Sequence, residues 1–218
     1  FHLNSTRKRM AEVLSSEQAW SKLVRGNKNF VSGVPEHRHQ DAEQRRELAG
    51  EQTPFAAVFG CSDSRLAAEM IFDVGLGDLF VVRNAGQVLA ETILGSLEFA
   101  VEVIGVPLIL ILGHDQCGAI KAGMAAQEGK LSAKGEFIHN IVNRITPTIE
   151  RGLALGETSI DEFTNRHIKD TVQEIADRSA VIRDAIKAGR VAIVGAQYKL
   201  ELGEVHVVEY RGKIELDR

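Results

Sequence analysis

Cysteine is scarce in this sequence of 218 residues, which contains only Cys61 and Cys117. Two cysteines cannot supply the disulfide framework that is typical of small secreted domains. The chain is also long enough to bury an apolar core without such staples. The two thiols therefore have three possible uses, namely metal binding, catalysis or simple burial in the core.

Long apolar runs and an excess of positive charge are also missing. The longest apolar run, residues 106–112, is far shorter than the roughly 20 residues that a membrane-spanning helix needs. The net charge is −4, which does not favour a nucleic-acid-binding surface. We therefore expect neither a membrane nor a nucleic acid as a partner. Because the given sequence carries no export signal, we expect a cytoplasmic location.

Four apolar runs after residue 54 predict the strands of a parallel sheet. They lack polar alternation, which is typical of strands buried on both faces, and they cover residues 55–59, 79–82, 108–112 and 191–194. A helix predicted over residues 90–103 supports a right-handed crossover between the second and third strands. Residues 204–210 alternate and closely follow the fourth run, so they predict an antiparallel edge strand.

The rest of the sequence predicts helices around this sheet. Ser16 is the expected cap of a first helix that reaches Phe30, with Gly26 weakening it. Further helices are expected over residues 42–48, 119–126, 137–151 and 158–188, the last long enough to contain a break. The predicted fold is α/β, with a mostly parallel central sheet of about four strands, an antiparallel C-terminal edge strand and flanking helices.

We interpret residues 1–218 as a single domain. Its predicted parts are an N-terminal helical arm over residues 1–50, a core with the reactive residues over 54–126, a helical region over 134–188 and C-terminal strands over 189–218. The first ten residues receive no functional assignment.

Two polar segments follow the first and third predicted strands and contain both cysteines. They read Cys-Ser-Asp-Ser-Arg over residues 61–65 and Gly-His-Asp-Gln-Cys-Gly over residues 113–118. Ligands of open parallel sheets bind beyond the carboxyl ends of the strands, so we expect the two segments to face each other. Two thiolates and one imidazole form a known kind of catalytic zinc site. Cys61, His114 and Cys117 are therefore the predicted ligands of Zn²⁺.

Asp63 and Arg65 decide whether this predicted zinc site is open. The Asp63 carboxylate can occupy the fourth metal position and close the site, or stay off the metal and accept a hydrogen bond from bound water. The planar guanidinium of Arg65 can hold that carboxylate through two hydrogen bonds. Structural zinc sites usually have four Cys or His ligands, so the three present here favour an open, catalytic site.

The two segments, together with Val-Val-Arg-Asn-Ala-Gly over residues 81–86, resemble the signatures of beta-class carbonic anhydrases, closely over residues 52–122. The resemblance implies an enzyme whose zinc-bound hydroxide hydrates carbon dioxide reversibly to bicarbonate and a proton. It implies that Cys61, His114 and Cys117 hold the zinc. It also implies that Asp63 and Arg65 form a catalytic pair, with Asp63 as the fourth ligand in a closed form.

A substrate pocket is also implied by the resemblance. It assigns substrate binding to the side-chain amide of Gln52 and to Gly118, and it assigns the apolar wall for carbon dioxide to Phe80 and Phe99. Phe99 is expected to come from a neighbouring subunit. Without the resemblance, both phenylalanines would be interpreted as core residues. The family also implies a homodimer or homotetramer in which N-terminal helices embrace the partner.

Several alternatives stay open at this stage. The same fold could hydrolyse carbon disulfide or carbonyl sulfide, and Cys61 and Cys117 could instead cycle as a disulfide in a redox protein. A binding protein whose zinc site is permanently closed by Asp63 is a third possibility. Relatives with an inhibitory bicarbonate site carry Trp where this chain has Val58, which favours the open form. No proton shuttle is assigned, since His37 and His39 qualify only by being histidines.

Overall fold

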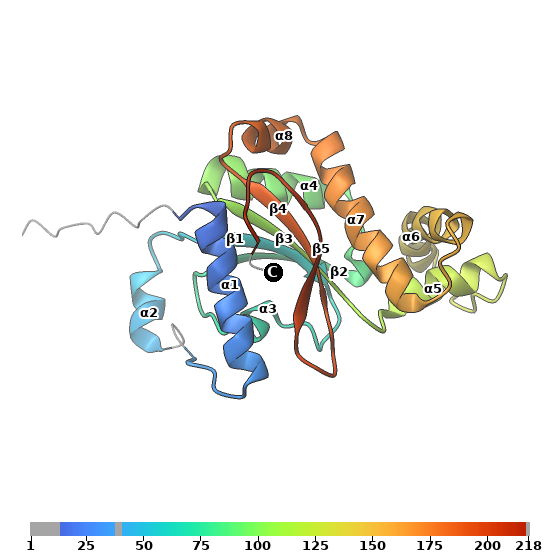
Figure 1. Cartoon of the computed structure of the whole chain (residues 1–218), viewed down its shortest axis with the longest axis horizontal. Coiled ribbons are helices and arrows are strands. Elements are labelled where there is room, and N and C mark those ends of the chain that lie inside the picture. The colour runs from blue at the N-terminus through green and yellow to red at the C-terminus, as the bar shows by residue number, and fades with distance from the viewer. Residues whose placement is uncertain (1–13, 38–40, 217–218) are drawn as a thin grey trace, which may run out of the picture.

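The computed structural model describes residues 14–37 and 41–216, and within them five strands form one sheet in the order β2-β1-β3-β4-β5 (Figure 1). Four strands run parallel, namely β1 (Ala56–Cys61), β2 (Leu79–Asn84), β3 (Leu108–His114) and β4 (Ala192–Tyr198). The last strand, β5 (Val205–Arg211), lies antiparallel to β4. The predicted sheet with its antiparallel C-terminal edge is confirmed.

Each of the central strands packs against apolar side chains on both faces, which explains why their sequences do not alternate. Successive side chains of a strand point to opposite faces of the sheet. On β3, Leu110 belongs to one buried cluster, whereas Ile109 and Ile111 belong to the other. The sheet therefore lies between two apolar layers, as a parallel sheet requires.

Helices on the two sides complete these layers. The cluster around Leu110 includes residues from α1 (Ser16–Val31), α3 (Ala68–Ile71), α5 (Gly118–Gln127) and α6 (Glu136–Ala154). The cluster on the other face includes residues from α4 (Glu91–Glu98), the π-helical segment η2 (Phe99–Ile104), α7 (Ile160–Arg178) and α8 (Ala180–Lys187). A further short helix, α2 (Ala42–Glu47), has no buried residues.

The first helix corrects one prediction and explains one glycine. Its cap is Ser15 and not Ser16, because the Ser15 hydroxyl accepts the backbone N–H of Gln18 while the Gln18 side chain accepts the N–H of Ser15. Gly26 lies against Phe72, and a Cβ at this position would lie 1.7 Å from the Phe72 carbonyl oxygen. The glycine therefore allows the close approach of α1 to the end of α3.

Two predicted helices are divided in the structure. The region over residues 90–103 is α4 followed by η2, which ends at Gly105 in the left-handed conformation at φ 84°. The region over residues 158–188 breaks at Ser179, whose hydroxyl accepts the backbone N–H of Ile182 and caps α8. The four-residue helix α3 was not predicted, because one turn is too short to show a helical period.

Some predictions are not tested by these elements. The interpretation of residues 1–218 as a single domain stays a prediction. Residues 1–10 and His39 lie outside the described residues. Across the described ranges, we find no helix whose length and apolar character would allow it to span a membrane.

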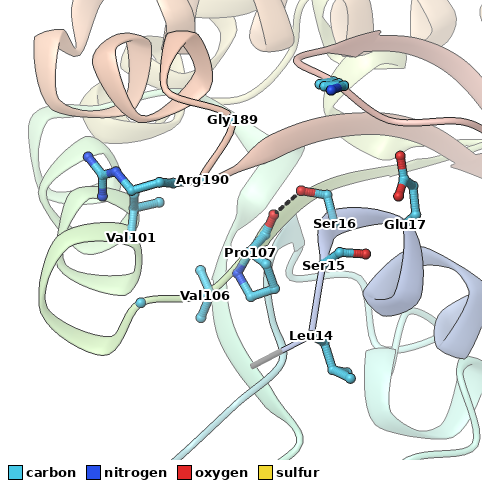
Figure 2. A pocket seen from close by; sticks show the side chains of 11 residues that line it. Leu14, Ser15, Ser16, Glu17, Val101, Val106, Pro107, Gly189 and Arg190 are labelled. Atoms are coloured by element: carbon cyan, nitrogen blue, oxygen red, sulfur yellow. Dashed lines mark hydrogen bonds between the residues drawn. The ribbon is translucent and has the colours of Figure 1, made fainter. Parts of the chain in front are cut away.

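A large cavity lies at the amino ends of β3 and β4 (Figure 2). Its volume is about 470 Å³, and its lining includes Pro107 just before β3 and Arg190 just before β4. The hydroxyl of Ser16 donates a hydrogen bond of 2.8 Å to the Pro107 carbonyl oxygen across this region. Neither cysteine lines this cavity, so the predicted reactive residues lie elsewhere.

Candidate metal centre

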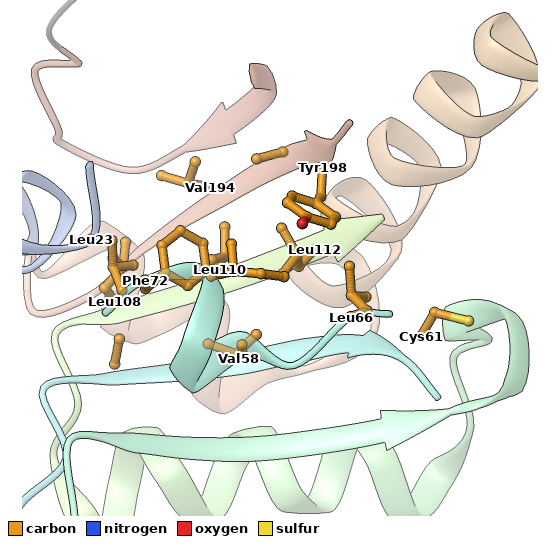
Figure 3. Close-up of a cluster of buried hydrophobic side chains, with 14 of the residues drawn as sticks. Leu23, Val58, Cys61, Leu66, Phe72, Leu108, Leu110, Leu112, Val194 and Tyr198 are labelled. Carbon is orange, nitrogen blue, oxygen red and sulfur yellow. The ribbon is translucent and has the colours of Figure 1, made fainter. Parts of the chain in front are cut away.

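Three potential metal ligands meet at the carboxyl ends of two neighbouring strands. Cys61 ends β1, His114 ends β3, and Cys117 lies directly before α5. One ligand atom from each of the three lies within 4.8 Å of the others, and all three residues are buried. Figure 3 shows Cys61 at the end of the apolar cluster that covers one face of the sheet. The sheet topology therefore brings together residues more than fifty positions apart.

The His114 ring is oriented as a metal ligand would be. Its Nδ1 lies 2.7 Å from the Asp115 carbonyl oxygen, which can only accept, so Nδ1 carries the proton. Nε2 then has a free lone pair, and it is buried without a conventional hydrogen bond to any described residue. A histidine fixed in this way through its other nitrogen is typical of metal sites. The donor set and the free Nε2 therefore fit a zinc ion.

A second group of contacts fixes the residue that orients His114. The Asp115 side chain accepts the backbone N–H of Leu200 at 2.9 Å, and the Asp115 N–H donates to the Tyr198 carbonyl oxygen at 3.2 Å. These bonds tie the loop after β3 to the end of β4. The position of the imidazole is consequently set by two strands.

Asp63 and Arg65 form the bidentate pair that the sequence predicts. Arg65 Nε lies 2.9 Å from Asp63 Oδ1, and Arg65 Nη2 lies 2.7 Å from Oδ2. The hydrogen bonds from Arg65 hold the pKa of the Asp63 carboxyl well below its usual range, against the opposing effect of burial. Asp63 Oδ2 lies 3.9 Å from His114 Nε2, so the clamped carboxylate faces the centre.

Arg83 braces the same loop, a contact that the sequence analysis missed. Its Nε donates to the Cys61 carbonyl oxygen at 2.8 Å, and its Nη2 donates to the Asp63 carbonyl oxygen at 2.6 Å. The sequence did mark this residue, because Arg83 belongs to the segment over residues 81–86 that carries part of the family resemblance. In the structure Arg83 pairs with Gly60 of β1, next to Cys61.

The two thiols lie close enough to share a proton. Their hydrogen bond lowers the pKa of Cys61, and backbone N–H groups of Asp63 and Gly86 act in the same direction. The same hydrogen bond, together with burial, raises the pKa of Cys117. Cys61 therefore loses its proton before Cys117 does, and a thiolate is the form of cysteine that binds a metal.

The predicted substrate residues are spread over the chain. Gly118 directly follows Cys117 and opens α5, so its backbone N–H lies beside the cluster. Gln52 is exposed and lies before the amino end of β1, opposite the end that carries Cys61. Phe80 pairs with Ala57, four residues from the level of Cys61, a separation of about 13 Å at 3.3 Å per residue. Within one chain, Gln52 and Phe80 do not reach the cluster.

Phe99 lies with Phe80 and not with the metal ligands. The two ring centroids are 6.2 Å apart, and Phe99 is 46% exposed. Phe80 is partly buried against the core, so the predicted apolar wall consists of one partly buried and one exposed ring, both away from the metal ligands of the same chain.

Gln87 and His167 lie beside the cluster although the sequence analysis did not single them out. Both line a small cavity together with Cys61, His114 and Cys117. Gln87 follows the segment over residues 81–86 and could have been included with it. His167 lies within α7, and no local motif marks it.

Comparison with known proteins identifies the family. The family model for carbonic anhydrase matches residues 56–205 of the chain. The chain belongs to the carbonic anhydrase family. Carbonic anhydrase 2 of Mycobacterium tuberculosis strain H37Rv is 46% identical over 197 residues, covering 90% of this chain and 94% of the relative. Carbonic anhydrase of Mycolicibacterium smegmatis is 47% identical over 197 residues, covering 90% of this chain and 95% of the relative.

Solved structures of beta-carbonic anhydrases share the fold of this chain. A Coccomyxa beta-carbonic anhydrase in complex with acetazolamide has a TM-score of 0.69 at 23% identity and covers 88% of both chains. Tetrameric beta-carbonic anhydrases from Sordaria macrospora have a TM-score of 0.69 at 20% identity, covering 83% of this chain and 92% of that chain. The implied family, enzyme class and zinc cofactor of this carbonic anhydrase are thereby confirmed. The heterocumulene hydrolase and thiol-redox alternatives are not favoured.

Proposed function

We propose that this protein hydrates carbon dioxide reversibly to bicarbonate and a proton, with zinc held by Cys61, His114 and Cys117. The observation that carries the proposal is the convergence of the three ligand atoms within 4.8 Å at the carboxyl ends of β1 and β3. Three protein ligands leave one tetrahedral position open. When bound, zinc supplies Lewis acidity that lets water lose its proton near pH 7.

Asp63 and Arg65 work as one unit in this proposal. Arg65 occupies both carboxylate oxygens, which keeps Asp63 ionised and turned toward the centre without making it a metal ligand. The carboxylate can then accept a hydrogen bond from the reacting water and orient it. This arrangement corresponds to the open form of the site.

Gly118 is the proposed donor to the substrate from this chain. The first N–H groups of a helix have no partner within the helix, and Gly118 opens α5 beside Cys117. Such a fixed donor stabilises negative charge that develops on a substrate oxygen. A glycine here also leaves space, because a Cβ would meet no atom within 4 Å.

The active form in this proposal is a homo-oligomer. Gln52, Phe80 and Phe99 would take part in the site only if a second subunit presents them, because one chain holds them away from its own cluster. Phe99, whose ring lies against Phe80 of the edge strand β2, is 46% exposed, and Val103 of the same segment η2 is 66% exposed. Exposed apolar side chains of this kind suit a subunit interface. Analytical ultracentrifugation tests this, and a fully active monomer would contradict it.

A cytoplasmic location is part of the proposal. Zinc binding by Cys61 and Cys117 needs both thiols reduced, and the cytoplasm keeps thiols reduced. Both cysteines are free in the structure. Recovery of the native protein in an exported fraction of the source cells would contradict this location.

The deciding experiment is stopped-flow hydration of carbon dioxide over about pH 6.5 to 9, with zinc content measured on the same sample. We expect about one zinc per chain and a rate that rises with pH. Zinc without turnover over the whole range would contradict the proposal and favour a site closed by Asp63. Asp63→Ala provides the second arm, because it lowers turnover in the open enzyme and changes nothing in an inactive binding protein.

A further inference from the structure

A turn beside the metal centre carries polar groups that the proposed reaction does not use. This turn is η1 (Ala85–Gln87), which follows β2 at the same end of the sheet as Cys61. The Gln87 side chain is 2% exposed, yet neither its Oε1 nor its Nε2 hydrogen-bonds to any described residue. Buried amides without partners are rare because each unsatisfied group costs free energy. The amide therefore points to a partner that the protein atoms do not supply.

The backbone of this turn is strained. Gly86 has φ 76° and Gln87 has φ 54°, so two successive residues adopt the left-handed conformation. Glycine adopts it readily, whereas a residue with a side chain pays for it. A Cβ on Gly86 would lie only 2.6 Å from the Cβ of Ala119, so the turn packs closely on α5. Such a conformation persists only when its surroundings hold it.

The side chain of His167, in α7, hydrogen-bonds to the backbone of this turn. Its Nε2 lies 3.0 Å from the Gly86 carbonyl oxygen and 3.1 Å from the Gln87 carbonyl oxygen. Carbonyl oxygens only accept, so Nε2 carries the proton and bridges both groups. His167 is 8% exposed and is separated from the turn by about 80 residues in sequence. A side chain from a distant helix therefore fixes a strained turn.

The turn and the metal ligands surround the same space. Gly86, Gln87 and His167 line one cavity together with the three metal ligands. Its volume is about 10 Å³, close to the least that holds one water molecule. The residue just before the turn is also tied to the end of β1, because the backbone N–H of Ser62 donates to the Asn84 carbonyl oxygen at 2.9 Å. A shift of the turn would consequently move Gly86 and Gln87 relative to the metal ligands.

We propose that His167 is a positioning residue of the metal centre, which holds the Gly86–Gln87 turn so that the Gln87 amide faces the metal ligands. The amide N–H is then available to a ligand thiolate through one buried water in the cavity that they share. Donors of this kind orient metal ligands and strengthen their hold on the ion. The inference rests on the zinc centre of the proposed function and adds residues outside the ligand set.

The test measures how fast zinc passes from the purified holoprotein to an excess of a colour-forming chelator. His167→Met keeps the bulk but removes the N–H donor, and we expect zinc loss about 10-fold faster or more. Gln87→Leu removes the positioned amide and should have an effect of similar size. The double variant should lose zinc no faster than His167→Met alone, because both act through one path.

Two further variants separate positioning from a general loss of packing. His167→Gln keeps an N–H donor and should retain zinc within about threefold of the wild type. Thr171→Val is the matched control, because it removes a buried hydrogen bond of the same helix and leaves the Nε2 contacts in place. In cobalt-substituted protein, His167→Met should shift the thiolate-to-cobalt absorption, whereas Thr171→Val should not.

Several results would overturn the inference. Unchanged zinc loss in folded His167→Met or in Gln87→Leu would do so, as would equal zinc loss in Thr171→Val. If His167→Met does not fold, His167→Gln provides the test, and rapid zinc loss from that variant would overturn the inference. A wild-type protein without zinc would instead contradict the proposed function itself, so the two failures are distinguishable.

Discussion

The two ends of the central sheet differ in a way that cavity size alone does not reveal. The amino end carries a cavity of about 470 Å³, and the carboxyl end carries one of about 10 Å³ beside the two cysteines. The large cavity holds Arg190, which is exposed and lies 3.8 Å from Glu102 in a loose ion pair. The small one gathers three ligand atoms within 4.8 Å. Convergence of donor atoms, and not volume, therefore marks the reactive end.

The physical reason lies in the direction of the strands. The carboxyl ends of neighbouring parallel strands lie at the same edge of the sheet. The residues that follow β1 and β3 are therefore close in space although they are far apart in sequence. At the same edge α5 begins, and the backbone N–H groups of Ala119 and Ile120 in its first turn hydrogen-bond to the Cys117 sulfur. At the amino end α1 begins beside the large cavity, but no cysteine or histidine lines that cavity. The predictions below test how far this contrast extends.

Loss of a ligand at the carboxyl end should have the largest effect. Cys117→Ser removes one of three ligands and should abolish stable zinc binding, lowering kcat/KM by about 1000-fold or more, beyond the 10- to 100-fold typical of outer-shell changes. Zinc analysis and stopped-flow hydration measure both effects, and circular dichroism checks that the chain is folded. A variant with full zinc and full activity would remove Cys117 from the site.

Loss of the Asp63 clamp should have the next largest effect. Arg65→Gln frees the carboxylate and should lower kcat/KM by about 10- to 100-fold, the scale of a lost orienting contact. Combining it with Asp63→Asn should add little, since the two residues act as one unit. Arg178→Gln breaks the ion pair of Arg178 with Glu174 on the outside of α7 and serves as the control. If the losses of kcat/KM in Arg65→Gln and Asp63→Asn simply add in the double variant, the two residues do not act as one unit.

A buried polar residue of α1 should affect stability and not chemistry. Asn27 donates to the carbonyl oxygens of Ile71 and Gly203 and accepts the backbone N–H of Val205. Asn27→Ala leaves these three groups without partners and should lower the free energy of unfolding by about 3 kcal/mol or more, at about 1–3 kcal/mol for each group.

Urea denaturation measures the change in Asn27→Ala, with zinc content as the second readout. Asn29→Ala, which removes one half-exposed bond to Asp73, is the milder control. Loss of zinc from folded Asn27→Ala would contradict the prediction, because it would show that Asn27 also supports the metal centre.

Acid should weaken the fold through His167. Burial lowers the pKa of His167, so the unfolded chain takes up its proton first as the pH falls through the ordinary value near 6.5. Stability is therefore present above that value and is lost below it, by up to about 1.4 kcal/mol per pH unit. The gap in unfolding free energy between wild type and His167→Gln should narrow between about pH 7.5 and pH 5.5. A constant gap would mean that His167 is not buried as the neutral ring.

The smallest effect is expected at the large cavity. Arg190 and Glu102 are both more than half exposed, and exposed ion pairs contribute about 0–1 kcal/mol. Arg190→Ala should change the unfolding free energy by less than about 0.5 kcal/mol and leave kcat/KM unchanged. Kinetics and urea denaturation on one preparation test this. A large loss of activity would show that the amino end takes part in the reaction.

Local sequence determined the elements of this protein and the identity of its ligands. Apolar runs without alternation predict strands buried on both faces, and the segments after two of them contain the only cysteines and a histidine at a spacing that zinc uses. The resemblance added the enzyme class. Where the sequence was wrong, the cause was a local competition, as at Ser15, where a reciprocal hydrogen bond with Gln18 moved the helix start by one residue.

Only the tertiary structure decided which distant groups share a site. The contact of His167 with the turn before Val88 crosses about 80 residues, and no local pattern encodes a hydrogen bond to a carbonyl oxygen that far away. The structure also showed that Gln52 and Phe80 lie away from the cluster of their own chain, because distance along a strand is fixed at about 3.3 Å per residue. Sequence thus sets the chemistry of each side chain, while packing sets its neighbours.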